Sequence, residues 1–348
     1  MMVVLGTDAH KKTHTIVACD PGGAEIGSIT VAATSCGHLR AVQWAAQWDE
    51  RCWAIEDCRH LSRRLETELL AAGETMVRVP PKMMAGQRRS ARTRGKSDPI
   101  DALAVARAAL REPDLPQARL DGPAREVRLL VDYRESLIRE RTGLQNRLRW
   151  RLHELDPGFD PPAGSLDRYK TLASVMAMLA GHQGLVADLA RRETARIEQI
   201  TREANQLARD ITARVAAIVP SLLEIPGCGA LTAAKLVGEA ADITRFANRN
   251  AYAMWAGTAP IPVWSGNPNR FRLNRGGNRQ TNAALHRIAV TQIRMHPDAK
   301  HFMTRRLSNG DTKREALRAL KRRLADVAYR AMINDTQTTT QTAQPQAA

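Results

Sequence analysis

The chain has 348 residues, a hydrophobic fraction of 43% and a formal net charge of +16. Its length allows two or three domains, and its hydrophobic fraction excludes a wholly disordered protein. No apolar run approaches the roughly 18 residues that span a bilayer, and the start lacks the cationic region of a secretory signal, so we expect a cytoplasmic protein without membrane contact. Five cysteines without a CxxC pair fit a reducing compartment. So basic a chain points to nucleic acid as its partner.

The first predicted domain, residues 1–112, mixes strands and helices. Three short apolar segments joined by turns predict three strands, and the first of them ends near Asp8. Helical and extended patterns then alternate, and the last is a helix that opens at Ser97 with Pro99 in its first turn. Three strands followed by alternating helices and strands is the element order of an RNase H-like α/β fold.

A linker is predicted at residues 113–123 and a helical arm at residues 124–219. Two long segments, one beginning near Glu126 and the other covering 185–219, carry apolar residues at helical spacing with many arginines between them. Two helices of this length can pair in an antiparallel coiled coil. The sequence therefore predicts an arm built from two long helices.

A mainly helical C-terminal domain is predicted for residues 220–335, followed by a polar, disordered tail at 336–348. The sequence IPGCG between two helical segments resembles the turn of a helix-hairpin-helix. In such a motif Gly227 and Gly229 would let backbone amides approach a phosphate closely. The alternative is an ordinary helical hairpin in which a glycine only ends a helix.

Four carboxylates from distant segments are the candidate metal ligands. Asp8 and Glu56 each end a predicted strand, and Asp98 and Asp101 are three residues apart at the start of a helix, which puts them on one face. Phosphoryl transfer on nucleic acids commonly uses divalent metal ions held by carboxylates on a rigid scaffold. Singly each acid fits a solvated strand end or a helix N-terminal charge, but together they predict a site for Mg²⁺ or Mn²⁺.

Two other patterns carry less weight. His10 and His14 are four residues apart, but on a strand or turn this spacing does not define a ligand pair. The segment SARTRGKS ends like a phosphate-binding loop, yet Ser90 stands where the first glycine of that motif belongs, so we expect no nucleotide cofactor.

Two basic windows of the sequence hold no Asp or Glu. Residues 75–97 contain seven Lys or Arg, and residues 243–297 contain eight, all of them Arg. Arginine binds phosphate with two parallel hydrogen bonds and stacks on bases, which suits nucleic-acid contact better than a solvated face would. The candidate contact residues of the two windows are Arg88, Arg89, Arg92, Arg94, Lys96, Arg270, Arg272, Arg275 and Arg279. The second window contains one serine, Ser265, which directly precedes Gly266.

Taken in order, these motifs resemble the DEDD transposases of the insertion-sequence-110 family. The resemblance is carried by GTDAHKKTH, AIEDC, GKSDPIDALAVA, IPGCGALTAAKLVGE and WAGTAPIPVWSGNPNRFRLNRGGNRQTNAALHRIA, which span nearly the whole chain. It implies a RuvC-like N-terminal domain, a coiled-coil arm and a C-terminal transposase domain in a prokaryotic, nucleoid-associated enzyme.

For individual residues the resemblance implies an acidic tetrad at Asp8, Glu56, Asp98 and Asp101 and a serine nucleophile at Ser265. It also implies a noncoding bridge RNA that pairs with donor and target DNA, and a dimer or tetramer in which one subunit's tetrad meets another subunit's serine. Family members differ in the residues just after the serine, and this chain has NPNRF there.

Two other functions remain open at the level of sequence. A RuvC-like endonuclease or junction resolvase would use the same acids with water as nucleophile and would leave free DNA ends. A non-catalytic nucleic-acid-binding protein would need only the basic windows and would show no metal dependence.

Overall fold

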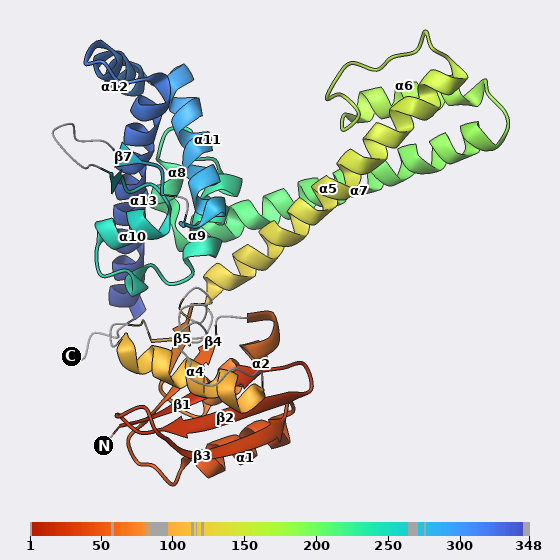
Figure 1. The fold of residues 1–348 in the computed structure, drawn as a ribbon. Coiled ribbons are helices and arrows are strands. Elements are labelled where there is room, and N and C mark those ends of the chain that lie inside the picture. Colours follow the sequence, from red (N-terminus) through yellow and green to blue (C-terminus); the bar gives the residue numbers. More distant parts are fainter. Residues whose placement is uncertain are drawn as a thin grey trace. The chain divides into compact units, whose positions relative to one another are not determined.

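The computed structural model describes residues 2–56, 59–80, 83, 97–112, 115, 117–119, 122–263, 271–274 and 276–343. The chain divides into two compact units, Met1–Leu120 and Asp121–Ala348, shown in Figure 1. The division falls inside the segment for which the sequence predicts a linker. No helix among the described residues is long and apolar enough to cross a membrane.

A five-stranded sheet with the order β3-β2-β1-β4-β5 forms the first unit. Its first three strands are antiparallel to one another, whereas β4 is parallel to β1 and β5 is parallel to β4. This mixed topology confirms the RNase H-like, RuvC-like fold predicted from the element order. The strands are β1 (Val3–Ala9), β2 (Thr13–Cys19), β3 (Glu25–Ala32), β4 (Arg51–Glu56) and β5 (Met76–Val79).

Helices cover both faces of this sheet. Helices α1 (Ser35–Ala45) and α2 (Arg59–Ala71) share one apolar cluster with Leu5 and Trp53 of the sheet. Helix α4 (Asp98–Arg111) packs on the opposite face, with a separate cluster that includes Val4, Ala54 and Ala106. Since alternate residues of a strand point to opposite faces, the even-numbered residues of β1 and β4 face α4.

The approach of α4 to the sheet depends on Gly6 of β1. A Cβ atom at Gly6 would lie 2.1 Å from the backbone oxygen of Ala102 and 2.5 Å from the backbone nitrogen of Ala106. No side chain fits there, so the missing Cβ lets the helix backbone lie directly on the strand. This contact sets how close the N-terminal turn of α4 comes to the end of β1.

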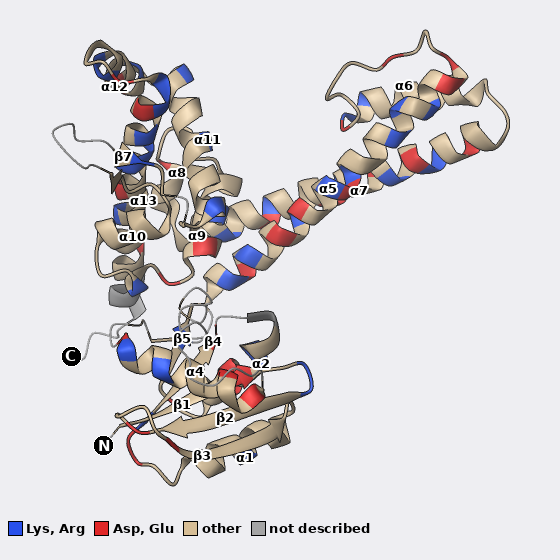
Figure 2. Cartoon of the chain, viewed as in Figure 1, with Lys and Arg blue, Asp and Glu red and all other residues tan. Residues whose placement is uncertain are grey.

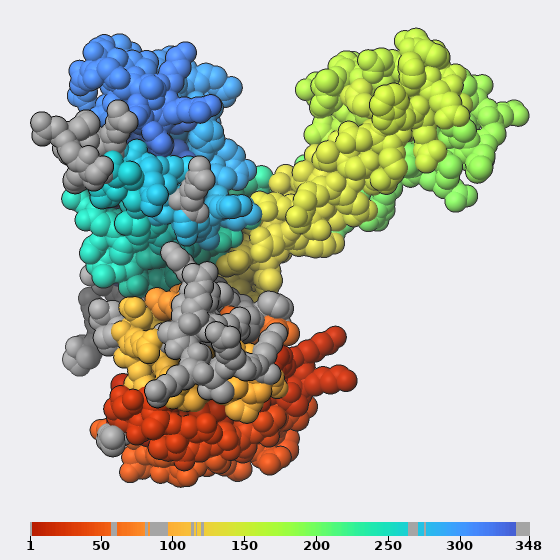
Figure 3. All heavy atoms as spheres, in the orientation of Figure 1, coloured from red at the N-terminus to blue at the C-terminus, as the bar shows by residue number. Residues whose placement is uncertain are grey.

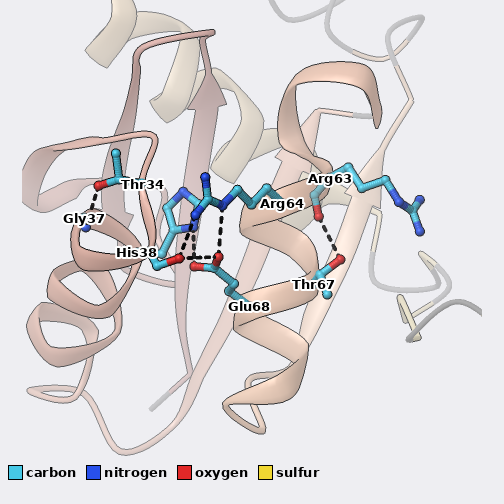
Figure 4. Close-up of polar contacts among 8 residues, drawn as sticks. Thr34, Gly37, His38, Arg63, Arg64, Thr67 and Glu68 are labelled. Carbon is cyan, nitrogen blue, oxygen red and sulfur yellow. Dashed lines mark hydrogen bonds and ion pairs between the residues drawn. The ribbon is translucent and has the colours of Figure 1, made fainter.

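A buried histidine pair lies on the α1 side of the sheet. The ring centroids of His14 and His38 are 5.1 Å apart, and each side chain is 1% exposed. Glu68 of α2 accepts a hydrogen bond of 2.6 Å from Nδ1 of His38 and also binds Arg64 (Figure 4). The pKa of His14 is lowered to about 4, first by burial and then by the charges of His38 and His10.

The second unit begins with the predicted arm, which contains α5 (Pro123–Leu155), α6 (Tyr169–Ala180) and α7 (Leu185–Ile218). Helices α5 and α7 lie side by side, and α6, which the sequence analysis did not predict, packs on α7 and completes an apolar cluster (Figures 1 and 3). Acidic and basic residues are interspersed along α5 and α7 (Figure 2).

The remaining helices form one large core with the base of the arm. They are α8 (Pro220–Leu223), α9 (Ala230–Ala240), the 3-10 helix η1 (Ile243–Arg245), α10 (Arg249–Trp255), α11 (Arg279–Met295), α12 (Pro297–Ser308) and α13 (Lys313–Ala343). Two short antiparallel strands, β6 (Ile261–Pro262) and β7 (Phe271–Arg272), precede α11. The mainly helical character predicted for this region is confirmed.

The end of α13 differs from the disordered tail predicted for 336–348. The helix continues to Ala343, and the hydroxyls of Thr336 and Thr338 donate hydrogen bonds to the backbone oxygens of Met332 and Asn334. Extending an existing helix costs far less than starting one, so polar residues with modest helix propensity can continue it.

Candidate active site and nucleic-acid contacts

The site begins at the carboxyl ends of two adjacent parallel strands. Thr7 of β1 pairs with Ile55 of β4, so Asp8 and Glu56, one residue further on, occupy equivalent positions on neighbouring strands. Both belong to the even-numbered set that faces α4. Parallel strands lie about 4.8 Å apart, which brings these two carboxylates to the same edge of the sheet.

The first turn of helix α4 contributes two more acids to this edge of the sheet. Asp98 and Asp101 both lie in its first turn, and the backbone nitrogen of Asp101 donates to the backbone oxygen of Ser97. Pro99 fits this first turn because it needs no backbone donor there. Acidic residues are commonly found in the first turn of a helix, where they complement the positive end of the helix dipole.

His10 links the acids of the strand and the helix. Its Nε2 atom lies 3.0 Å from Oδ2 of Asp8 and 3.4 Å from Oδ1 of Asp98. Potential ligand atoms of Asp8, His10 and Asp98 all lie within 4.8 Å of one another. The structure thus gathers two of the four predicted carboxylates in one group, with Asp101 on the same helical turn and Glu56 on the next strand.

Asp8 is the least exposed member of this group, with 13% of its side chain exposed. Burial raises its pKa, and the negative charges of Asp101 and Asp98 raise it further, while the charge and hydrogen bond of His10 lower it. A carboxylate in this position gains from a nearby cation. The cluster therefore has the electrostatic character of a cation site.

His10 was missed by the sequence interpretation, which weighed it only as a partner of His14. The two histidines lie in different environments: His14 is buried beside His38, whereas His10 contacts Asp8. The signal for His10 was its position two residues after Asp8, just beyond the end of β1. Gly6 was missed as well, because its role depends on the path of α4.

Many of the predicted nucleic-acid contacts lie outside the described residues. These are Ser265, Arg88, Arg89, Arg92, Arg94, Lys96, Arg270 and Arg275. Arg272 of β7 and Arg279 at the start of α11 are described, and both are exposed. They lie in the part of the second unit that holds the short β6–β7 hairpin.

The two hairpin glycines have different surroundings. Gly227 has a φ of 81°, and a Cβ there would meet the side chain of Thr291 at 3.0 Å, so this glycine allows the turn to pack against α11. Gly229 is the N-cap residue of α9, and no atom of the described structure lies within 4 Å of where its Cβ would be. Gly229 therefore leaves its side of the turn open.

The arginines of the arm are largely occupied by carboxylates. Arg147 and Arg151 of α5 both bind Glu193 of α7, at 3.3 and 3.0 Å, and Arg196 of α7 binds Glu140 of α5 at 2.9 Å. These pairs join the two helices, which explains the interspersed charges in Figure 2. Much of the arginine content of the arm is thus used within the protein.

An RNase H-like sheet with carboxylates gathered at the ends of β1 and α4 defines an enzyme that transfers phosphoryl groups on nucleic acids. Comparison with known proteins gives the family. Residues 5–157 match the profile of the DEDD transposases of the IS110 type, and residues 219–304 match that of the "Transposase IS116/IS110/IS902 family". The chain belongs to the IS110/IS116/IS900 family of transposases, which are metal-dependent enzymes that act on DNA.

Two relatives match almost end to end. A 44.8 kDa protein of insertion element IS116 from Streptomyces clavuligerus is 26% identical over 95% of this chain and 94% of its own length. A 42 kDa protein of IS900 from Mycobacterium paratuberculosis is 26% identical over 95% of both chains.

Among solved structures, RuvC of T. thermophilus in complex with a Holliday junction substrate covers 32% of this chain and 95% of its own, with 13% identity and a TM-score of 0.27. The strand order and strand directions of the sheet define its RuvC-like fold.

Proposed function

We propose that this transposase cuts and rejoins the DNA of its insertion sequence with Ser265 as nucleophile and Mg²⁺ or Mn²⁺ on the acidic tetrad, guided by a noncoding bridge RNA. The observation that carries the proposal is the group formed by Asp8, His10 and Asp98, with ligand atoms within 4.8 Å of one another. The carboxylate oxygens of Asp8 and Asp98 are hard ligands that suit both metals.

The residues of the site fit a divalent cation. The pKa of Asp8 is raised by burial and by neighbouring acids, so added positive charge would stabilise the carboxylate form. Asp8, Glu56, Asp98 and Asp101 would hold the metal, and His10 would give up its contact with one of the aspartates or join the ligands. When bound, the metal stabilises negative charge that develops on the phosphate.

The covalent step is proposed for Ser265. Its Oγ would attack the phosphorus of a DNA phosphodiester, form an Oγ–P bond and break the bond to the 3′ oxygen. The serine proton is lost, and a proton is taken up by the leaving oxygen, which becomes a free 3′-hydroxyl. Because the phosphoserine link conserves the bond energy, attack by another 3′-hydroxyl can rejoin the strands without ATP.

Sequence choice is proposed to rest on the RNA. The chain carries no zinc-finger pattern, and its hairpin at Gly227 and Gly229 would contact backbone phosphates, which position DNA without specifying it. Arginines of the two acid-free windows, of which Arg272 and Arg279 are described and exposed, would bind strands of RNA or DNA. A guide could then read DNA by base pairing.

The working form is proposed to be a dimer or tetramer. In it the tetrad of one subunit would act on the strand bound to the serine of another. This arrangement would make isolated subunits inactive and would tie cleavage to assembly of the complete DNA complex.

A denaturing gel tests the chemistry. Wild-type protein mixed with RNA, Mg²⁺ and DNA carrying both sites should give a covalent protein–DNA adduct, and Ser265→Ala should give none while retaining its fold. Adduct formed by Ser265→Ala would show that the nucleophile lies elsewhere. Cleaved DNA with free ends and no adduct would favour the water-using nuclease, and the absence of metal-dependent cleavage would favour a binding protein.

A second experiment tests the guide. Protein purified free of nucleic acid is mixed with the same DNA, with and without the transcript of the element. Changing the pairing segments of the RNA should redirect the product to matching DNA. Efficient, site-specific recombination by RNA-free protein would contradict guidance and assign sequence choice to the side chains.

A further inference from the structure

A cavity of about 450 Å³ lies in the second unit, where β7, α11 and α13 meet. Its apolar wall includes Leu273 and Ala283, and its polar wall includes Arg279, His286 and Lys321. Leu273 and Asn274 of this wall directly follow β7, the strand that pairs with β6. The cavity is therefore built partly by the chain that leaves the β6–β7 hairpin.

Two asparagines of the wall are already saturated by structural hydrogen bonds. The Asn282 amide nitrogen donates to the backbone oxygens of Ala256 and Gly257, and its oxygen accepts from Lys321. Asn274 donates to Met254 and accepts from the backbone nitrogen of Gly276. Neither amide is left to read the edge of a base, so the polar side chains of the wall that remain for a ligand are the basic ones.

Lys321 supplies the strongest of these groups. Its side chain is buried, with 8% of the residue exposed, and its one hydrogen bond among the described residues goes to the neutral amide of Asn282. No carboxylate of the described residues forms an ion pair with it. Burial lowers the pKa of this ammonium group.

The other buried lysine of this unit, Lys235, is paired with carboxylates. Lys235 is 3% exposed and contacts Glu135 at 2.9 Å and Asp132 at 3.3 Å. Buried charges are ordinarily paired in this way because an uncompensated one is costly. Lys321 departs from that pattern at the wall of an open cavity, which indicates that its partner is an anion that the protein binds.

Two further basic side chains lie at the rim of the cavity. Arg279 and His286 are exposed, and neither side chain makes a hydrogen bond or ion pair with a described residue. The charge of Lys321 contributes to lowering the pKa of His286, after the larger effect of burial. Three nitrogen donors thus converge on one opening.

We propose that this cavity binds a phosphate group of the DNA backbone through Lys321, Arg279 and His286. DNA is favoured over a free anion because the cavity is open and large enough for a nucleotide. The inference rests on the proposed function for one point only, that the strand held beside the β6–β7 hairpin is the strand attacked by Ser265. The cavity would then hold that strand in register for cleavage.

The test measures DNA binding separately from cleavage. Full-length protein with Ser265→Ala is titrated with a fluorescent DNA duplex and, in parallel, with RNA of the same sequence. Ala283→Glu puts a carboxylate into the cavity from an exposed position, and we expect it to weaken DNA binding roughly tenfold. Lys321→Met should lower the slope of log Kd against log salt concentration by about one, the effect of losing one phosphate contact.

Matched controls carry the same charge changes outside the cavity. Val290→Glu lies exposed on the same helix as Ala283, and Lys313→Met lies exposed on the same helix as Lys321. Both should stay within about twofold of the parent, as expected for substitutions away from the contact. The Tm of Ala283→Glu should not fall, because the new carboxylate can pair with Lys321. Should Lys321→Met fail to fold, Ala283→Glu decides the question alone.

Loss of DNA affinity in Ala283→Glu, beyond that of Val290→Glu, supports the proposal whatever the RNA arm shows. Unchanged DNA binding, or a loss confined to RNA, overturns it. The result is independent of the serine chemistry, because all proteins carry Ser265→Ala. Adduct formation by that parent would contradict the proposed nucleophile and leave the binding result in force.

Discussion

Each unit of this transposase holds one cluster of like-charged side chains, and the two clusters have opposite sign. At the end of β1 and the start of α4, acids gather around one histidine, and burial raises the pKa of Asp8. In the cavity lined by α11 and α13, the basic side chains of Arg279, His286 and Lys321 lie together, and no Asp or Glu is among the described lining residues. Burial lowers the pKa of Lys321. Each cluster is unfavourable alone and would be stabilised by a ligand of opposite charge, a metal ion in the first case and a phosphate in the second.

In the described residues of the arm and at its base, many charges are compensated within the protein. The arginines of the arm bind carboxylates of the facing helix, and Lys235 binds two acids of α5. Uncompensated clusters therefore mark function better than charge content does. The arm is rich in arginine, yet its geometry indicates that many of these residues serve to join two helices.

The largest expected effect is on the acidic cluster. Asp8→Asn, Glu56→Gln, Asp98→Asn and Asp101→Asn each remove an anionic ligand while keeping the shape of the side chain. We expect each to reduce strand cleavage by more than roughly 100-fold, since weaker contacts around bound metals already cost 10- to 100-fold. Glu25→Gln, an exposed acid on β3, is the control for charge and should cleave normally. Cleavage that survives all four substitutions, or excess chelator, would remove the acids from the chemistry.

The next effect concerns the contact that positions the cluster. Gly6→Ala forces a Cβ into the backbone of α4, and we expect it to lower the free energy of unfolding by about 3 kcal/mol and to reduce cleavage. Gly143→Ala, in the middle of α5, has only the end of Arg147 within 4 Å and should raise stability by up to roughly 1 kcal/mol. Equal stabilities of the two variants in urea would contradict the close approach of α4 to β1.

A smaller effect should appear when pH is lowered. The pKa of His14 is about 4 in the folded protein against an ordinary value of 6.5, so the unfolded chain binds more protons between these values. Stability that is full above about pH 6.5 is then lost as pH falls toward 4, by at most roughly 3 kcal/mol.

The pH effect is measured as Tm against pH for wild type and His14→Leu. The Leu variant should flatten the profile, because it cannot take up the proton, whereas His153→Gln on the exposed surface of α5 should leave it unchanged. Parallel profiles for wild type and His14→Leu would show that the buried pair does not govern acid stability.

The smallest effect contrasts the two buried lysines. Lys235→Met removes the ammonium partner of Asp132 and Glu135. Asp132 keeps its contact with Arg128 at 3.6 Å, and both carboxylates can be solvated because their side chains are 49% and 40% exposed. We expect a loss of about 2 kcal/mol in stability, below the cost of stranding a fully buried charge, with DNA affinity unchanged. A stability loss of that size in Lys321→Met, equal to that in Lys235→Met, would erase the distinction between a paired and a ligand-binding lysine.

Helices and strands whose apolar residues repeat at a fixed spacing could be predicted from the sequence. The alternation of strands and helices gave the sheet, and helical spacing of apolar residues located α5 and α7 nearly to their ends. Asp8 and Glu56 could be predicted because strand ends at one edge of a parallel pair must meet. Asp98 and Asp101 followed from their spacing in a first helical turn.

Features that depend on tertiary contact could not be predicted in this way. His10 joins the site only because α4 begins beside the end of β1, and Gly6 matters only because the backbone of α4 crosses it. Lys321 lies outside both acid-free windows, 75–97 and 243–297, and its burial depends on the packing of α13. The ion pairs of the arm arginines could not be predicted either, because their partners lie on the facing helix.

The most direct test of the account is the binding of Mn²⁺ to the free protein, followed by electron paramagnetic resonance. Wild-type protein should bind Mn²⁺ at the acidic cluster, and Asp8→Asn and Asp98→Asn should each lose that binding while retaining the Tm of the wild type. Glu25→Gln should bind as wild type does. Undiminished Mn²⁺ binding in both aspartate variants would contradict the claim that the acids at the end of β1 and the start of α4 form the metal centre of this transposase.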